Sequence, residues 1–187
     1  FIDEVVNGDV HTANMKMAGL EERSQAKTFI YALMYGAGPA KIGSVVGGSA
    51  KEGQELTDRF LKNMPKLRNL RNQVTEAAES GLIKGLDGRL LHIRNSFSAL
   101  NTLIQGAGAV VCKQWLVHMM AEVYASGLDV KLVGSIHDEY QFEVVNQDVK
   151  RFTEITKYAM TKTAKTLNLN CPLDSEHKVG TTWLQTH

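Results

Sequence analysis

Two adjacent carboxylates, Asp138 and Glu139, stand directly after His137 and between two short runs rich in apolar residues. Asp is disfavoured in strands, and neighbouring negative charges repel each other unless a cation lies beside them. Mg²⁺ prefers hard oxygen ligands and is usually held by one or two carboxylates together with substrate phosphates. We therefore predict a metal site with Asp138 as its first candidate ligand, because successive strand side chains point to opposite faces. The alternative is an ordinary solvated turn, the commonest setting of an Asp-Glu pair.

A second group of reactive side chains recurs every four residues: Arg23, Lys27, Tyr31 and Tyr35, followed by Gly36. On a helix these residues form a row along one face, and each step advances about 6 Å along the axis. Arginine and lysine bind phosphate oxygens, and an aromatic ring further along can contact a sugar or a base. The row therefore suits a nucleoside triphosphate. The alternative is a pair of solvated cations beside tyrosines that pack in the core.

Helical periodicity and stop signals predict the elements that carry these residues. The row lies on an expected helix over residues 21–35, and Asp9 is a candidate N-cap for the helix before it. The other expected helices cover residues 10–18, 40–46, 49–63, 65–80, 98–125 and 147–167. The Asp-Gly dipeptide at 87–88 predicts one β-hairpin, and residues 130–136 and 140–145 predict a second, joined by His137-Asp138-Glu139. The expected fold class is α+β.

Length and composition limit the possible classes of protein. A chain of 187 residues can form one good-sized core or two small subdomains, and 21 basic against 20 acidic residues leave the net charge uninformative about partners. The two cysteines lack metal-ligand spacing, and no run approaches the ~20 apolar residues of a membrane span. We expect a reducing, cytoplasmic location and no membrane partner. Since Phe1 already stands in a helical pattern, we interpret the chain as an excerpt or a processed product.

The two motifs occur together in one known family. A helix with Arg-x3-Lys-x3-Tyr-x3-Tyr-Gly, followed about a hundred residues later by His-Asp-Glu between strands, resembles the family A (Pol I type) DNA polymerases. Gly88-Arg89 and Asn101-x3-Gln105 match the same family in the same order, so the resemblance covers essentially the whole chain. Two segments, Asp9-Val10-His11-Thr12 and Lys27-Thr28-Phe29-Ile30-Tyr31, are similar to the corresponding sequences of the phage replicative branch of this family.

The resemblance implies both an architecture and a reaction. A mainly helical fingers subdomain would cover residues 1–100, and the C-terminal part of the palm would cover residues 101–187 with the His-Asp-Glu hairpin at 130–145. The implied reaction is template-directed DNA synthesis by two-metal nucleotidyl transfer. Its implied cofactor is Mg²⁺, and its implied partners are primer-template DNA and dNTPs.

Roles for individual residues also follow from the resemblance. The implied nucleotide-binding residues are His11, Arg23, Lys27, Tyr31, Tyr35 and Gly36. The implied DNA-binding residues are Asn101, Gln105, His137 and Arg94. The implied catalytic residues are Asp138 as metal ligand, Glu139 as a secondary carboxylate and Lys27 as a general acid for the leaving pyrophosphate.

Tyr31 carries a further implication about nucleotide choice. Cellular members of the family generally have Phe at this position, and a Tyr hydroxyl can stand near the 3′ position of the sugar. Similar enzymes with Tyr accept 2′,3′-dideoxynucleotides readily. We expect the same of this chain.

The family's other metal carboxylate belongs to an Asp-x-Ser-x-x-Glu-x-Arg motif, and no such string occurs in this sequence. We therefore expect the chain to be inactive alone and to need an N-terminal palm and thumb segment, in the same chain or as a separate subunit. Two rival functions are a fragment of a single-subunit RNA polymerase, which typically has Ser in place of Glu139, and a non-catalytic nucleic-acid-binding module. The histidines at 92, 118 and 177 have surface or structural interpretations, and Trp183 and His187 resemble the family's ending without an assigned role.

Overall fold

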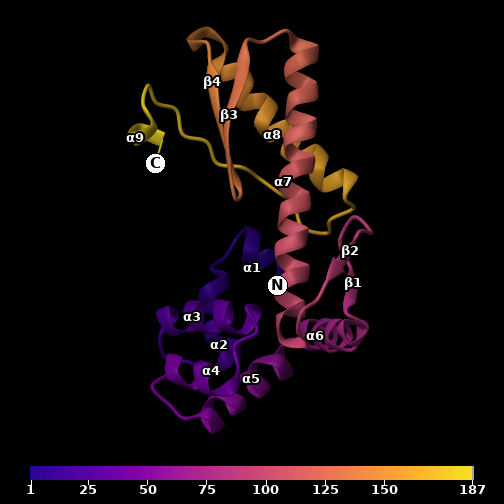
Figure 1. The fold of residues 1–187 in the computed structure, drawn as a ribbon. Coiled ribbons are helices and arrows are strands. Elements are labelled where there is room, and N and C mark those ends of the chain that lie inside the picture. Colours follow the sequence, from indigo (N-terminus) through magenta and orange to yellow (C-terminus); the bar gives the residue numbers. More distant parts are fainter. Residues whose placement is uncertain (187) are drawn as a thin grey trace. The chain divides into compact units, whose positions relative to one another are not determined.

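The computed structural model describes residues 1–186, and the chain divides into two compact units, Phe1–Gly106 and a second unit that begins at Ala107 (Figure 1). The first contains α1 (Ile2–Val6), α2 (Val10–Ala18), α3 (Arg23–Met34), α4 (Pro39–Val45), α5 (Ala50–Asn63), α6 (Pro65–Ala77), η1 (Ala78–Ser80), β1 (Leu82–Lys84), β2 (Leu90–His92) and η2 (Ser96–Ser98). Helix α7 (Ala99–Ser126) contains the division, and β3 (Val130–Ile136), β4 (Glu139–Val144), η3 (Asn146–Asp148), α8 (Val149–Thr166) and α9 (Trp183–Thr186) follow. Mainly helical elements with two antiparallel hairpins confirm the α+β class.

Capping residues mark the ends of several helices in the first unit. The Asp9 carboxylate accepts a hydrogen bond from the His11 backbone N–H at the start of α2, and Gly19 ends this helix in the left-handed conformation at φ 67°. Ser49 and Glu52 form a reciprocal capping box at the start of α5. Helix α3 begins at Arg23 and not at Glu21 as predicted, because Glu22 has an extended backbone. Both acidic residues therefore precede the helix.

The main core of the first unit lies between α2, α3, α4 and α5. Phe29 and Phe60 meet edge to face with ring centroids 5.2 Å apart, and both are fully buried. Helices α4 and α5 approach closely at Gly43 and Gly53, where a Cβ on Gly53 would collide with the backbone of α4. Phe29 therefore anchors the inner face of α3 and leaves its other face outward.

The second unit is a β-hairpin packed on two helices, and Figure 1 shows β3 and β4 beside α7 and α8. Strands β3 and β4 are antiparallel, with Ile136 paired to Glu139 and a bulge between Leu132 and Gly134. The core between hairpin and helices consists of Trp115, Met119, Val123, Phe152, Ile155, Ala159 and Met160. Prediction placed the start of the second strand at residue 140, but Glu139 already belongs to β4, so only two residues form the turn.

The tail after α8 is irregular, as expected, except for the unexpected α9. Both cysteines are free thiols. No helix within residues 1–186 is long and apolar enough to cross a membrane.

Candidate active site

The predicted row of Arg23, Lys27 and Tyr31 lies on the exposed face of α3. All three side chains are exposed, whereas Ala26, Phe29 and Leu33 on the opposite face are buried in the core. Tyr31 is 50% exposed and Tyr35, at the C-terminal end of the helix, is 58% exposed. The alternative that these tyrosines are core aromatics is therefore wrong. Two cations and two phenols share one accessible surface.

The end of α3 is held in a tight turn against the segment before α7. Gly36 has φ 76°, and a Cβ at this position would collide with the carbonyl oxygen of Phe97. The Gln105 side-chain amide donates a hydrogen bond of 3.3 Å to the Tyr35 hydroxyl. The structure therefore brings together three predicted site residues, Tyr35, Gly36 and Gln105.

Contacts also join the starts of α2 and α3. The His11 ring lies 6.4 Å from the Tyr31 ring, centroid to centroid, with 51° between their planes. Arg23 donates two hydrogen bonds to Asp9, from Nε at 2.7 Å and from Nη2 at 3.0 Å. Asp9 was predicted only as a helix cap, and the separation of 14 residues from Arg23 gave no sequence signal for this ion pair.

Asn101 and Arg94 are the other predicted DNA-binding residues of the first unit. Asn101 is half-buried on α7, one helical turn before the exposed Gln105. Arg94 is exposed in the segment after β2.

The His-Asp-Glu motif forms the tip of the β3–β4 hairpin in the second unit. His137 has φ 53°, a left-handed conformation that His adopts more often than most residues with a Cβ. His137 and Asp138 are exposed, and the half-buried Glu139 accepts a hydrogen bond from the side chain of Gln141. The tip therefore presents one exposed carboxylate and one that is engaged along its own strand.

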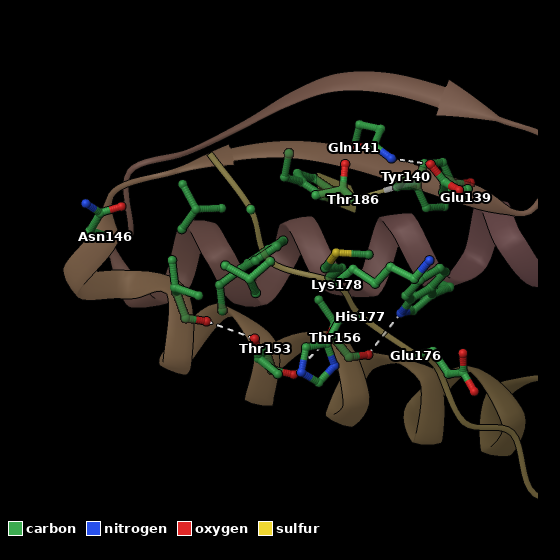
Figure 2. A pocket seen from close by; sticks show the side chains of 18 residues that line it. Glu139, Tyr140, Gln141, Asn146, Thr153, Thr156, Glu176, His177, Lys178 and Thr186 are labelled. Atoms are coloured by element: carbon green, nitrogen blue, oxygen red, sulfur yellow. Dashed lines mark hydrogen bonds between the residues drawn. The ribbon is translucent and has the colours of Figure 1, made fainter. Parts of the chain in front are cut away.

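A cavity of about 470 Å³ lies beside strand β4 and is also bordered by α7, α8 and residues 176–180 of the tail. Figure 2 shows Glu139 and Gln141 hydrogen-bonded at one end of it, with His177 and Lys178 among the side chains from the tail. Asp138 is not among its lining residues. The two neighbouring carboxylates thus face different surroundings, as strand alternation predicts.

The charge of Asp138 affects the pKa of Cys112, a residue of α7. The pKa of the Cys112 thiol is raised above its ordinary value, first by burial and then by the negative charge of Asp138. The pKa of Tyr140 is likewise raised, chiefly by burial. Both shifts favour the neutral thiol and the neutral phenol.

The donor chemistry of Asp138 fits one ligand of a divalent ion. Its carboxylate is exposed and supplies hard oxygens of the kind that Mg²⁺ binds. Among residues 1–186, however, no three His, Cys, Asp or Glu side chains gather closely enough to hold a metal ion. The hairpin therefore offers part of a site that further ligands would have to complete.

His118, which was interpreted as a surface or structural residue, contacts two polar side chains. His118 Nε2 lies 3.1 Å from both Gln114 Nε2 and Thr166 Oγ1. Its pKa is lowered, first by burial and then by the charge of Lys162. Trp183 is 55% exposed on α9, and His187 lies outside the described residues.

The chain thus combines an α+β fold with an exposed row of cations and phenols on α3 and an exposed carboxylate at the tip of the β3–β4 hairpin. The sequence model of DNA polymerase family A matches residues 4–185, so this chain belongs to that family. The predicted family resemblance is confirmed.

Known relatives support this membership. The chain is 41% identical over 192 residues to the DNA-directed DNA polymerase of Escherichia phage Phieco32, an alignment that covers 99% of this chain and 31% of that protein. It is 36% identical over 209 residues to the DNA-directed DNA polymerase of Escherichia phage T7, covering 100% of this chain and 30% of that protein. DNA polymerase I of Aquifex aeolicus is 32% identical over 87% of this chain. The chain thus spans about a third of the length of the curated relatives it matches.

A solved structure supports the fold. The POL domain of Pol1 from M. smegmatis, in complex with DNA primer-template and dNTP, matches with a TM-score of 0.76 and 20% sequence identity. The match covers 87% of this chain and 32% of that one.

Proposed function

We propose that this chain is the fingers and C-terminal palm portion of a DNA-directed DNA polymerase. The exposed row of Arg23, Lys27 and Tyr31 on α3 is the observation that carries the proposal. Its two cations stand next to each other along the helix face, and the tyrosine ring follows them. This order matches the order of phosphates, sugar and base in a dNTP.

Each group has a role that its chemistry supports. Arg23 and Lys27 bind the triphosphate, His11 contacts its distal phosphates, and Tyr31 stacks on the incoming nucleotide. Lys27 donates a proton to the leaving pyrophosphate, because an ammonium group can be both charge partner and acid.

The end of α3 meets the template. Tyr35 and Gly36 border the templating base, and Gln105 already contacts the Tyr35 hydroxyl. Asn101, Gln105, His137 and Arg94 are the proposed contacts to primer-template DNA. A side-chain donor in the minor groove meets acceptors shared by all base pairs, which suits an enzyme that copies any sequence.

Asp138 would hold Mg²⁺, with Glu139 as a secondary carboxylate. An ion held there would supply positive charge that favours ionisation of the primer hydroxyl and stabilises the leaving group. Since the chain lacks the Asp-x-Ser-x-x-Glu-x-Arg motif, we further propose that residues 1–187 alone do not extend a primer.

The first test is binding of dATP to the 187-residue chain, measured by calorimetry. Lys27→Ala should raise the Kd about tenfold or more, since a hydrogen bond to a charged group is worth roughly 1.5–3 kcal/mol. Lys51→Ala is the matched control, because Lys51 is an exposed helical lysine that pairs with Glu55 four residues further along its own helix. Equal affinities of wild type and Lys27→Ala would contradict the proposed role of α3.

The second test is primer extension with Mg²⁺. The isolated chain should leave the primer unextended, and extension would refute its proposed inactivity. Joining a segment with the carboxylate motif ahead of residue 1 should give extension with dNTPs in preference to rNTPs. A preference for rNTPs would instead indicate an RNA polymerase.

A further inference from the structure

Asp9 makes four hydrogen bonds that join the start of α2 to the start of α3. Its Oδ1 accepts from the backbone N–H of His11 at 3.0 Å and from Arg23 Nη2 at 3.0 Å. Its Oδ2 accepts from Thr12 Oγ1 at 2.8 Å and from Arg23 Nε at 2.7 Å. One carboxylate thus caps the helix that carries His11 and binds the side chain of Arg23 as a fork.

The Asp9–Arg23 pair is ionised under ordinary conditions. The hydrogen bond from Arg23 is the largest cause that holds the pKa of Asp9 well below its usual value, and the bond from Thr12 is the next. The pKa of Arg23 is raised by the same contact. The side chain of Asp9 is 43% exposed and that of Arg23 is 54% exposed. Ion pairs with this much exposure add little to folding stability. Stability is therefore a weak reason for this geometry.

We propose that Asp9 is a positioning residue that orients Arg23 and the first turn of α2 to receive the phosphates of a nucleotide. The inference rests on the proposed binding of dNTPs by α3. A guanidinium group has five N–H donors, and Asp9 takes two of them, so three remain for phosphate oxygens. Because the same carboxylate caps α2, it also sets where His11 lies relative to Arg23.

This arrangement leads to an unusual expectation about charge. A carboxylate next to a phosphate site repels the ligand, so its neutralisation should tighten binding if Asp9 is only a surface charge. If Asp9 positions Arg23, neutralisation should weaken binding instead, because the long arginine side chain loses its fixed orientation. The direction of the change separates the two interpretations.

Asp9→Asn is the informative variant. Asn is as good an N-cap as Asp, so its amide oxygen can still accept from the His11 backbone N–H. Its NH₂ group cannot accept from Thr12 or from Arg23 Nε, so the fork to Arg23 is lost. We expect the Kd for Mg²⁺-dATP and for inorganic tripolyphosphate to rise about tenfold, and weak binding of deoxyadenosine to stay the same.

Asp87→Asn is the matched control within the same unit. Asp87 also binds an arginine through Nε and Nη2, since Arg89 Nε lies 2.9 Å and Nη2 lies 2.7 Å from Asp87 Oδ2. This variant removes a similar pair away from α3, and its Kd for dATP and tripolyphosphate should equal that of the wild type.

A double-mutant cycle with Arg23→Ala completes the test. If Asp9 acts through Arg23, Asp9→Asn should change the Kd no further when Arg23 is already Ala. A loss of affinity that persists in that background, or an Asp9→Asn variant that binds as tightly as the wild type or more tightly, would overturn the inference. The proposed function fails separately, if Arg23→Ala and Lys27→Ala both bind dATP like the wild type.

Discussion

The Tyr31 hydroxyl is the single group on which nucleotide choice should depend most directly. Tyr31 is half exposed on α3, and the centroid of its ring lies 6.4 Å from that of the His11 ring. We expect an enzyme that contains this chain behind the upstream carboxylate segment to incorporate dideoxynucleotides readily. Tyr31→Phe should select against them, because the phenol no longer stands in for the missing 3′-hydroxyl. Competitive incorporation of ddNTP against dNTP measures this, and an unchanged ratio would contradict the role of Tyr31.

The control at this scale is Tyr124→Phe. Tyr124 is 77% exposed on the second unit's part of α7 and has no proposed contact with nucleotide. Its incorporation ratio should equal that of the wild type. A shift of similar size in both variants would show that loss of any phenol alters the assay.

At the scale of elements, the turn after α3 depends on Gly36. This residue combines φ 76° with a close approach of the Phe97 carbonyl, so an added Cβ would meet both backbone strain and a collision. Gly36→Ala should lower the free energy of unfolding by about 1–3 kcal/mol. Urea denaturation followed by circular dichroism measures the change.

Gly108→Ala is a control with the opposite expected sign. Gly108 lies in the interior of α7, and within residues 1–186 a Cβ there would meet no atom closer than 4 Å apart from its chain neighbours and the backbone of its own helix. Alanine should stabilise the helix by about 0.5–1 kcal/mol, because it reduces the backbone entropy lost on folding. Destabilisation by both variants to the same extent would show that the turn at Gly36 has no special requirement.

At the scale of the whole molecule, the two units should respond differently to acid. His118 in the second unit has a lowered pKa, chiefly from burial, so its neutral form is favoured in the folded state. The unfolded chain then binds a proton at higher pH than the folded unit does. The stabilisation is present above the unfolded pKa of about 6.5 and is lost as pH falls below it.

The measurement uses tryptophan fluorescence during urea unfolding. The chain has two tryptophans, Trp115 and Trp183, and both belong to the second unit. In the wild type, the urea concentration at the unfolding midpoint should decrease as the pH is lowered from about 7.5 to 5.5. His118→Gln should make this decrease smaller. His92→Gln, which changes an exposed histidine of the first unit, should leave it intact. An equal pH dependence in all three proteins would contradict the role of His118.

Lowered carboxylate pKa values place the acid response of the first unit at lower pH. Hydrogen bonds lower the pKa of Asp9, Glu52 and Asp87, all of which belong to this unit. All three side chains are exposed, so each adds only a small stabilisation above its unfolded pKa near 4, and this stabilisation is lost as pH falls below that value. The order of loss on acidification should thus be the second unit first.

The sequence by itself determined the family, the α+β class and most of the elements. Periodicity and caps are local, so Asp9 and Gly19 around α2 and Ser49 before α5 could be recognised within one or two turns of chain. The four-residue spacing of Arg23, Lys27 and Tyr31 likewise needs only a helix to define a common face. Asp138 and Glu139 could likewise be recognised, because they are adjacent in sequence and stand between two apolar runs.

Only the tertiary structure decided which face of α3 is buried and which partners its side chains have. Burial of Phe29 against Phe60 depends on residues from another helix, and it turns Tyr31 outward. The ion pair of Asp9 with Arg23 and the contact of Gln105 with Tyr35 join residues 14 and 70 positions apart. Such contacts leave no periodic trace in a single sequence, because they depend on how separate helices pack and not on the spacing within one of them.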